Sequence, residues 1–579
     1  MIFWTKTSKK RKSKPKPTSI VSADRQKLLQ RNHTLLGGVV VGIDGHLIEI
    51  QARAVQFLGK PATYIKATKI IGMSPGAARE TLARIHGAFS RLGIHTSPVE
   101  ILINLAPANI PKQGNWLDLP IALIMLQASG YLPKMDAAQL QKSIFVGELG
   151  LHGDVRSVPG VLSIAYAATS GQQIVVPRDN ERECQFVQQH NGRINVFGTE
   201  TLKSVVEFFQ GKRYLDGSPS IVSGLNRMSN RMSQLFTWIQ RAVSPCRDSN
   251  DTPLENMVAP VIDFGMIRGQ DQAKRAALIC AAGGHHMLMA GPPGEGKSLI
   301  AGALPGILPP LTNQERVELT RLHSACGLLA NASQTVTRRP MRAVHCTASR
   351  NALVGGGRNI PTPGEITRAH LGVLFLDEFP EFARDAIEGL RQPMESGRIT
   401  IARAEKSLDF PARFTLVAAM NPCPCGHHGT ARCTCRSAEV TRYQRRISGP
   451  ILDRIDLQVS LTALTNAERF SPGTPGQTAQ MQCLVTAART MQSQRFRGES
   501  VAFNAAIPGG RVWDFCNFSV AALAHFQYMV NTNRISSRTM DRLAKVSRTI
   551  ADLEASERIE PHHITEAASF VIGGIFSVV

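Results

Sequence analysis

The strongest chemical signal in the sequence is a glycine-rich loop that ends in lysine and serine. An apolar run, residues 287–290, precedes the loop, and a second apolar run, residues 299–304, follows it. The loop has the pattern G-x-x-x-x-G-K-S, and its residues are Gly291, Pro292, Pro293, Gly294, Glu295, Gly296, Lys297 and Ser298. In a strand–loop–helix setting this pattern turns backbone N–H groups toward phosphates, and the helix N-terminus adds a favourable dipole. We predict that Lys297 reaches the β- and γ-phosphates of a nucleotide and that Ser298 ligates Mg²⁺.

Two later apolar runs end in side chains that suit hydrolysis of a nucleoside triphosphate. Residues 372–376 lead to Asp377 and Glu378, and residues 414–420 lead to Asn421. An acid after a strand is common on its own, but after a phosphate loop it predicts a second part of the same site. Asp377 would approach the Mg²⁺, Glu378 would polarise the attacking water, and Asn421 would orient that water beside the γ-phosphate. The alternative for Asn421 is a simple turn residue.

An arginine further along the chain has two possible roles. Arg454 lies between Asp453 and Asp456. It could reach the nucleotide of a neighbouring subunit and stabilise transition-state charge, which would require an oligomer. It could equally form a local network of ion pairs with the two aspartates. Spacing alone does not decide between these roles.

A short stretch after the third apolar run holds four cysteines in two C-x-C pairs. They are Cys423, Cys425, Cys433 and Cys435. Four thiolates this close in sequence predict a tetrahedral Zn²⁺ site, for which His427 and His428 are alternative ligands. The other interpretation is a loop of reduced thiols, because C-x-C is less usual than C-x₂-C in zinc sites.

The elements that position these residues fall into several predicted regions. Residues 1–31 read as a disordered basic tail, residues 32–210 as an α/β domain, and residues 211–256 as a linker. Residues 257–460 contain the nucleotide motifs, and residues 461–579 form a connecting segment and a mostly helical end. In that end, the spacing of Leu543, Val546, Ile550 and Leu553 predicts one apolar helix face.

The pattern within residues 32–210 predicts alternating strands and helices. We expect a strand pair over residues 37–50 around an Asp44-Gly45 turn. The other predicted elements are a helix over 77–92, a strand over 99–105, a buried helix over 120–127, and strands over 144–146 and 173–176.

Composition excludes several classes of protein. The 579 residues carry 66 Lys and Arg against 44 Asp and Glu, a net charge of +22, and 43% are hydrophobic. These values are typical of a globular protein, and no apolar run approaches the roughly 20 residues of a membrane span, so no membrane partner is expected. The 11 cysteines are odd in number and four are crowded together, which predicts a reducing, cytoplasmic compartment. The positive charge favours a polyanion such as nucleic acid, although a basic solvated surface would give the same count.

From about residue 32 to the end, the chain resembles the magnesium-chelatase-like AAA+ ATPases, in particular the ComM/YifB group. The resemblance rests on long, specific segments: GGGRNIPTPGEI at 355–366, AHLGVLFLDEFPEF at 369–382, LRQPME at 390–395, AAMNPCPCG at 418–426 and SGPILDRID at 448–456.

This resemblance implies an AAA+ P-loop ATPase core with a parallel sheet, a C-terminal helical lid, ATP and Mg²⁺ as ligands, and hexameric rings. Arg454 matches the family's arginine finger. Arg538 matches the sensor-2 arginine, which contacts the γ-phosphate through the lid. ComM-type members are implicated in DNA branch migration during natural transformation, so the implied partner is single-stranded or branched DNA.

The first domain looks similar to the Lon protease domain, which has the ribosomal-S5-type α/β fold. The matching stretches are residues 104–114, 118–122 and 146–156. A Lon-type protease needs a serine nucleophile and a lysine base. The stretch after Gly114 has no serine and the stretch after Gly153 has no lysine, so we expect a non-proteolytic scaffold or DNA-engaging module.

The chain departs from the family's usual pattern at a few places. Residues 60–73 follow the pattern loosely, His345 and Cys346 stand where two histidines are expected, and Glu295 occupies a position that is commonly small. None of these departures removes a residue of the predicted nucleotide site.

Two basic segments offer contacts for a phosphate backbone. Residues 395–406 read as a hairpin that faces the central pore in related ring ATPases, and it carries Arg398, Arg403 and Lys406. Residues 338–358 form a second basic segment. Ordinary solvated charges are the alternative in both cases. No base-reading motif is present, so DNA binding is expected to depend on structure and not on base sequence.

The sequence leaves two hypotheses for function. The first is a hexameric motor that moves on branched DNA, and the second is a metal-insertion or protein-remodelling ATPase of the magnesium chelatase type. The first domain, the four cysteines and the positive charge favour the motor, whereas the nucleotide motifs are common to both.

Overall fold

The computed structural model describes residues 31–57, 68–96, 99–112, 114–132, 142–191, 194–210, 262–329, 335–357, 361–402, 407–428 and 432–573. The chain forms two compact units. The first comprises Met1–Met228 with Gly327–Gln334, and the second comprises Ser229–Cys326 with Thr335–Val579. The predicted linker, and all of the predicted tail except residue 31, lie outside the described residues.

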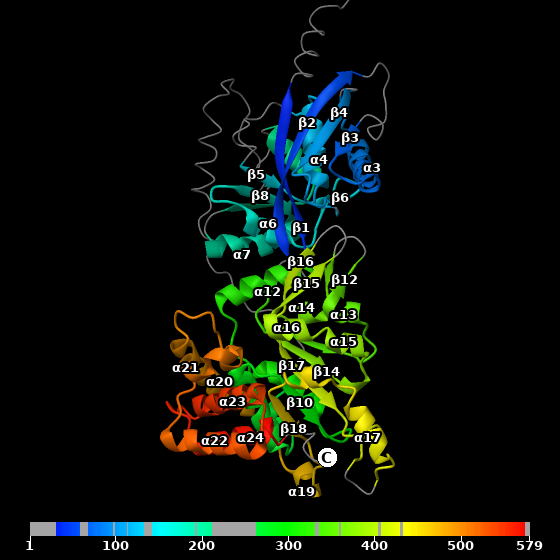
Figure 1. Ribbon diagram of the computed structural model, residues 1–579. Helices are drawn as coiled ribbons and strands as arrows, with labels where there is room; N and C mark the ends of the chain where they lie inside the picture. Colours follow the sequence, from blue (N-terminus) through cyan, green and yellow to red (C-terminus); the bar gives the residue numbers. More distant parts are fainter. Residues whose placement is uncertain are drawn as a thin grey trace, which may run out of the picture. The chain divides into compact units, whose positions relative to one another are not determined.

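The first unit is built on a seven-stranded mixed sheet in the order β3-β4-β2-β1-β5-β8-β9 (Figure 1). Its strands are β1 Asn32–Val41, β2 Asp44–Phe57, β3 Thr68–Ile71, β4 Val99–Ala106, β5 Ser143–Phe145, β8 Gln173–Pro177 and β9 Asn195–Thr199. The predicted strand pair is confirmed, but its predicted turn is wrong. Val41 pairs with Asp44, so the chain turns at Gly42 and Ile43. Gly42 has φ 68°, and glycine adopts this left-handed conformation without the clash that a Cβ would cause.

Helices pack against this sheet, and the predicted helices are confirmed. They are α3 Pro75–Arg91, α4 Asp118–Ala128, α6 Val161–Ala167, α7 Glu181–Asn191 and α8 Leu202–Phe209, and the short strands β6 Glu148–Leu149 and β7 Val155–Arg156 pair with each other. Every residue of α4 is buried, because the helix is apolar around its circumference and lies against β1 and β2. Its one buried acid, Asp118, pairs with Arg84 of α3 at 2.6 Å.

The second unit is built on a five-stranded parallel sheet in the order β11-β14-β17-β10-β18. The strands are β10 Met287–Ala290, β11 Met341–Val344, β14 Val373–Leu376, β17 Thr415–Met420 and β18 Leu457–Ser460. The central strands are almost wholly buried and read as continuous apolar runs, as expected for a parallel sheet covered on both faces.

Helices and two small hairpins surround this sheet (Figure 1). The helices before the lid are α10 Asp271–Gly283, α11 Lys297–Ala303, α12 Asn313–Ala325, α13 Arg350–Val354, α14 Glu365–Arg368, α15 Arg384–Glu388, α16 Arg391–Ser396, α17 Ser437–Gln444, α18 Gly449–Leu452 and α19 Asn466–Phe470. The hairpins are β12 Gly355–Gly356 with β13 Thr362–Pro363, and β15 Arg398–Ala402 with β16 Ser407–Pro411.

The C-terminal part is helical, as predicted. Its helices are α20 Gln477–Arg495, α21 Val512–Phe515, α22 Val520–Asn533, α23 Ser537–Leu553 and α24 Pro561–Val571. The predicted apolar face of α23 is buried, with Leu543, Val546 and Ile550 fully inaccessible to solvent. Helices α20 and α23 pack against α10, so the lid shares its core with the sheet.

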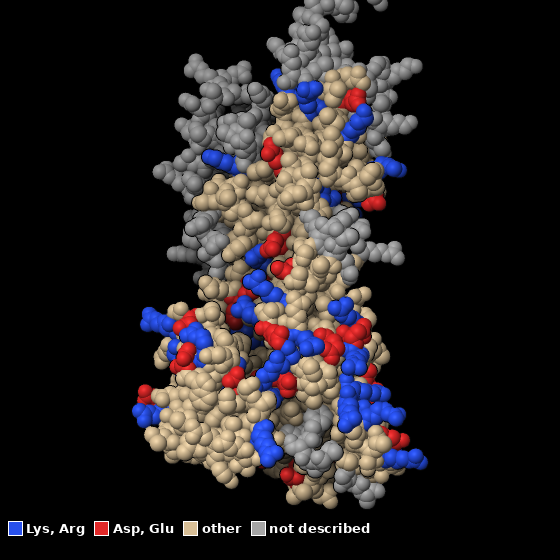
Figure 2. Space-filling view, in the orientation of Figure 1, with Lys and Arg blue, Asp and Glu red and all other residues tan. Residues whose placement is uncertain are grey.

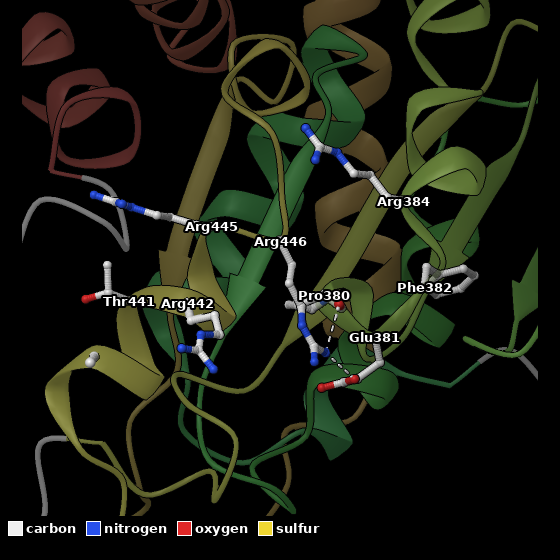
Figure 3. Close-up of a pocket in the computed structure, with 9 residues that line it drawn as sticks. Pro380, Glu381, Phe382, Arg384, Thr441, Arg442, Arg445 and Arg446 are labelled. Atoms are coloured by element: carbon white, nitrogen blue, oxygen red, sulfur yellow. Dashed lines mark hydrogen bonds and ion pairs between the residues drawn. The ribbon is translucent and has the colours of Figure 1, made fainter.

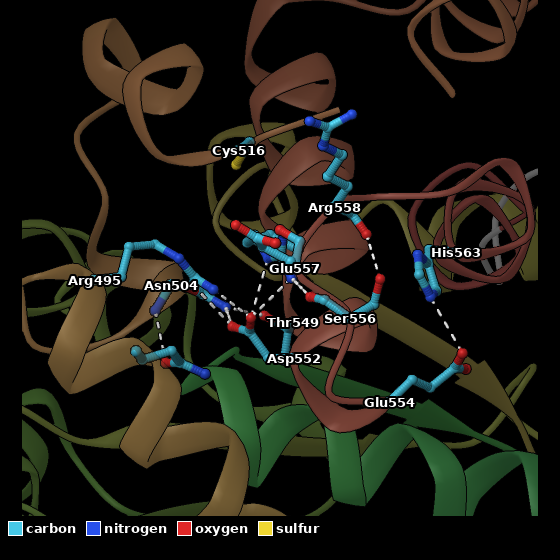
Figure 4. Close-up of polar contacts among 12 residues, drawn as sticks. Arg495, Asn504, Cys516, Thr549, Asp552, Glu554, Ser556, Glu557, Arg558 and His563 are labelled. Carbon is cyan, nitrogen blue, oxygen red and sulfur yellow. Dashed lines mark hydrogen bonds and ion pairs between the residues drawn. The ribbon is translucent and has the colours of Figure 1, made fainter. Parts of the chain in front are cut away.

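A buried polar network also joins the lid to the sheet. Asp552 of α23 accepts hydrogen bonds from Arg495, Asn504 and Arg548 (Figure 4). One turn earlier, Thr549 hydrogen-bonds His285 at 2.8 Å, and the other ring nitrogen of His285 bonds Asp456 at 2.9 Å. His285 and Asp456 lie just before β10 and β18, so the network ties the lid to the amino ends of two adjacent strands.

Candidate active site

The parallel sheet of the second unit brings three of the predicted segments to one edge. In parallel strands all carboxyl ends meet at the same edge of the sheet. Ala290 at the end of β10 pairs with Met420 at the end of β17, and Leu376 at the end of β14 pairs with Ala418. The residues that follow these strands are therefore neighbours, as the sequence predicts.

The phosphate loop connects β10 to α11 with two residues in the left-handed region. Gly294 has φ 84° and Gly296 has φ 89°. A Cβ at either position would meet no atom within 4 Å, so backbone conformation and not space makes glycine favourable here. Gly296 is the residue before α11, and the helix begins at Lys297. The loop thus ends at a helix N-terminus, where backbone N–H groups and the helix dipole favour phosphate.

Lys297 is buried within the loop that it closes. Its Nζ donates hydrogen bonds to the Gly291 carbonyl at 2.5 Å, to the Pro292 carbonyl at 2.8 Å and to Asn421 Oδ1 at 3.2 Å. Burial lowers the pKa of the Lys297 ammonium. The predicted phosphate-binding lysine and the predicted water-orienting amide are thus in direct contact.

Ser298 and Asp377 form the second contact between predicted site residues. Ser298 Oγ donates a hydrogen bond to Asp377 Oδ2 at 3.1 Å. A hydroxyl and a carboxylate are oxygen ligands of the kind that Mg²⁺ prefers alongside water and phosphate. The two side chains therefore fit a Mg²⁺ ion carried by a nucleotide.

Glu378 follows Asp377 in an unusual backbone conformation. Its φ is 51°, in the left-handed region that glutamate rarely adopts, and its N–H donates to Asp377 Oδ1 at 2.9 Å. Its carboxylate accepts a hydrogen bond from Cys346 Sγ at 3.4 Å. In the sequence, Cys346 stands out only as a departure from a family pattern, and its contact with Glu378 is not predicted there. The signal was its position just beyond β11, a neighbour of β14.

Glu295, the unusual residue of the loop, contacts the segment that follows β18. Its carboxylate accepts a hydrogen bond from the Leu464 N–H at 3.2 Å and lies 3.5 Å from Arg469. These two contacts explain how a charged side chain fits at a position that is commonly small, because its carboxylate is hydrogen-bonded and paired with an arginine.

The two predicted arginines bind other groups in this chain. Arg454 donates hydrogen bonds to the Pro450 carbonyl and to Glu395. Arg538, at the start of α23, lies 3.7 Å from Asp453. Neither guanidinium hydrogen-bonds a phosphate-loop residue within the described part of the chain.

An open hollow close to Glu378 has four arginines among its nine lining residues. It has a volume of about 930 Å³ and lies between the turn after Glu378 and helix α17. Arg446 spans the hollow to the Pro380 carbonyl and to Glu381 (Figure 3). The other lining arginines, Arg384, Arg442 and Arg445, are exposed, and their side chains form no hydrogen bond or salt bridge with a described residue. The charge of Arg384 is close enough to Glu388 to help lower the pKa of that carboxyl.

The space-filling view agrees with this description of the surface. Figure 2 shows Lys and Arg side chains gathered over the part of the second unit where α17 lies. Elsewhere, the basic segment over residues 338–358 is partly neutralised, because Arg339 pairs with Glu315 and Arg342 pairs with Glu365. On the predicted hairpin, Arg398 is exposed on β15, whereas Arg403 and Lys406 lie outside the described residues.

The four predicted cysteines come together just after Asn421. Their sulfur atoms all lie within 4.8 Å of one another, and all four are free thiols. Backbone N–H groups of His427 and Thr434 hydrogen-bond the Cys425 sulfur and lower its pKa to about 5. Neither His427 nor His428 belongs to this group of ligand atoms.

Fold and site together define an AAA+ ATPase. Comparison with known proteins supports this class, because three family models of magnesium chelatase match the chain. The model "Magnesium chelatase, subunit ChlI" matches residues 263–469, "Subunit ChlI of Mg-chelatase" matches 61–180, and "Magnesium chelatase, subunit ChlI C-terminal" matches 476–570. No helix among the described residues is long and apolar enough to cross a membrane.

Similar proteins cover nearly the whole chain. Competence protein ComM of Haemophilus influenzae is 35% identical over 92% of this chain and 95% of its own length. YifB of Escherichia coli is 36% identical over 86% of this chain and 90% of its own length. The magnesium-chelatase 38 kDa subunit of Rhodobacter capsulatus is 30% identical over only 28% of this chain and 51% of its own length. The chain belongs to the ComM/YifB group of magnesium-chelatase-like proteins.

Proposed function

We propose that this protein hydrolyses ATP with Mg²⁺ and uses the energy to move along single-stranded or branched DNA. The observation that carries the ATPase part is the pair of contacts at the sheet edge, Lys297 with Asn421 and Ser298 with Asp377. Two of these side chains come from the end of the phosphate loop and one each from the segments after β14 and β17. They meet where a nucleoside triphosphate would place its β- and γ-phosphates and its metal ion.

Each residue has a distinct role in this proposal. Lys297 binds the β- and γ-phosphates, and the loop backbone encloses them. Ser298 and Asp377 hold the Mg²⁺, which neutralises charge on the phosphate oxygens when bound. Glu378 polarises the attacking water, and Asn421 orients that water. The Cys346 thiol holds the Glu378 carboxylate until a nucleotide and water take its place.

The remaining positive charge at the γ-phosphate comes from arginine in this proposal. Arg454 acts on the nucleotide of the neighbouring subunit, and Arg538 acts through the lid of its own subunit. The proposed ring, a hexamer, supplies the neighbour that such a finger requires.

The DNA part of the proposal is supported by charge and by similarity. Three exposed arginines, Arg384, Arg442 and Arg445, lie around one hollow, and the chain has a net charge of +22. Arginines placed in this way bind phosphate backbones without reading bases. The name of the H. influenzae relative points to competence, so we propose a role in natural transformation, in branch migration of incoming DNA in the cytoplasm.

A second candidate function is remodelling of a partner protein for metal insertion. It is favoured by the similarity to the magnesium-chelatase 38 kDa subunit, which is confined to 28% of this chain. Both functions need the same ATPase site. The DNA motor and the protein-remodelling ATPase therefore differ in the partner that they act on and not in the reaction that they catalyse.

The test is steady-state ATP hydrolysis with and without single-stranded, duplex and four-way-junction DNA at low salt. We expect junction or single-stranded DNA to stimulate hydrolysis, and Glu378→Gln to bind ATP but lose the activity. The triple variant R384Q/R442Q/R445Q should lower the ratio of stimulated to basal rate and its salt dependence. An ATP hydrolysis rate that no DNA changes would favour the protein-remodelling function.

A further inference from the structure

The four-cysteine cluster has the dimensions of a tetrahedral metal site. The Sγ atoms of Cys423 and Cys425 are 3.3 Å apart, those of Cys423 and Cys433 are 3.9 Å apart, and those of Cys425 and Cys433 are 3.7 Å apart. A Zn²⁺ ion with four thiolates at about 2.3 Å places the sulfurs about 3.8 Å from one another. A disulfide would instead bring two sulfurs to about 2.05 Å.

The local fold brings the two C-x-C pairs together. After Cys423 the chain makes a tight turn, in which the Gly426 N–H donates to the Cys423 carbonyl at 3.0 Å. Gly426 has φ 83°, so this turn depends on glycine. Cys423 is buried and the other three cysteines are partly exposed, so an ion can enter from one side.

The chemistry of the ligands selects the kind of ion and its role. Four thiolates in tetrahedral positions suit Zn²⁺, and an iron–sulfur cluster is the competing use of such a set. Four protein ligands leave no open position for water or substrate, so the site is structural and not catalytic.

The cluster lies against the nucleotide site. Cys423 is two residues after Asn421, which hydrogen-bonds Lys297. A Cβ on Gly426 would lie 2.9 Å from the Pro293 side chain, so the cysteine turn packs directly on the phosphate loop. On its other side, Gln444 at the end of α17 donates to the Pro422 carbonyl at 3.2 Å.

We propose that Cys423, Cys425, Cys433 and Cys435 bind one structural Zn²⁺ that braces the phosphate loop and the Asn421 turn. The ion fixes the turn on which Pro293 rests and anchors the segment leading to α17, which carries part of the arginine-lined hollow. The metal site stands on its own geometry, whereas its effect on nucleotide binding rests on the proposed ATPase function.

The first experiment measures metal in the purified full-length protein by mass spectrometry. We expect one zinc per chain, and no stoichiometric iron. The double variant C433S/C435S should lose the zinc, whereas the matched control C483S, an exposed cysteine on α20 outside the cluster, should keep it. Titration of the wild-type thiols with a mercurial should release the zinc into a chromogenic chelator, which tests the site without any variant.

Cobalt provides a readout that does not depend on folding of a variant. Reduced wild-type protein stripped of zinc should bind Co²⁺ with the charge-transfer and visible bands of a tetrahedral tetrathiolate complex. Protein from zinc-supplemented cells that holds no zinc and takes up no cobalt would overturn the metal site, and stoichiometric iron would overturn its assignment to zinc.

Nucleotide binding then tests whether the zinc site stabilises the phosphate loop. Removal of zinc should weaken binding of a fluorescent ATP analogue by roughly tenfold, the lower end of the effect of losing groups that orient a metal site. Unchanged affinity in the stripped protein would overturn the brace but leave the metal site. Zinc-loaded protein that binds no nucleotide would contradict the proposed ATPase function and leave the metal site intact.

Discussion

The phosphate-loop edge of the sheet differs from the arginine edge, which comprises Arg454, Arg538 and the groups that they contact, in what its predicted residues bind. At the phosphate-loop edge the predicted residues hydrogen-bond one another, Lys297 with Asn421 and Ser298 with Asp377. At the arginine edge, Arg454 binds the Pro450 carbonyl and Glu395, and Arg538 lies beside Asp453. The predicted residues at the phosphate-loop edge thus contact one another, whereas the two predicted arginines contact other groups of the same chain.

This difference follows from how each edge is built. Strand ends of one parallel sheet meet regardless of any partner, so a single chain assembles them. A finger that acts on a neighbouring nucleotide has its target in another molecule, and its guanidinium must find other acceptors in the single chain.

The largest effect is expected from removing Arg454, the proposed arginine finger. Arg454→Ala should lower kcat for ATP hydrolysis about 10³-fold, because arginine fingers contribute on the order of 10³ to 10⁵. Mixing this variant with Glu378→Gln should restore part of the activity, because a mixed ring contains interfaces with an intact Glu378 on one side and an intact Arg454 on the other.

Each variant alone, at the same total concentration, is the control for the mixture. Activity that equals the sum of the two separate variants would show that Arg454 acts within its own subunit, and the contrast between the two edges would fail.

The next effect concerns the lid, which carries Arg538. Asp552→Ala should lower the free energy of unfolding by roughly 3 to 5 kcal/mol, because Arg495 and Arg548 would lose their buried partner. The measurement is urea unfolding of the full chain. Asp514→Ala, which removes an exposed partner of Arg511, should change stability by less than about 1 kcal/mol. Equal effects of the two substitutions would contradict a lid held by this network.

A smaller effect is expected from releasing Arg454, the proposed finger, from its ion pair with Glu395. Glu395→Gln should raise the ATPase rate at limiting protein concentration by at most about fivefold. The reason is that an ion pair with an exposed carboxylate contributes up to about 1 kcal/mol. Glu388→Gln, which disrupts the pair with Arg391, is the matched control and should leave the rate unchanged. A fall in rate for Glu395→Gln would indicate that Glu395 positions the finger and does not restrain it.

The smallest effect is a proton linkage confined to the phosphate-loop edge. Burial lowers the pKa of Lys297, so a larger fraction of the free protein is neutral at alkaline pH than for an ordinary lysine. Bound phosphates raise that pKa again, so ATP binding near pH 9 should take up a fraction of a proton. Calorimetry in two buffers of different ionisation enthalpy measures the uptake. Lys297→Arg should abolish it, because a guanidinium stays charged, and equal uptake in that variant would assign the proton to another group.

Much of the phosphate-loop edge was predictable because its pattern specifies local structure. The glycines, Lys297 and the strand before them define a loop whose conformation depends on few distant residues. What could not be predicted depends on contacts across the fold. Glu295 binds Leu464, and Cys346 binds Glu378, through packing that no local spacing reveals. The turn at Gly42 was missed because Asp44-Gly45 is the stronger turn signal in the sequence alone.

The place of β10 within its sheet has a consequence for local unfolding. β10 is hydrogen-bonded on both sides, to β17 and to β18, whereas β11 pairs only with β14 among the described strands. A fluctuation that frees an edge strand breaks one ladder, but freeing β10 requires two to break together. Amide hydrogens of β10 should therefore exchange with solvent among the last in this unit. The phosphate loop therefore begins from a part of the sheet that opens among the least often.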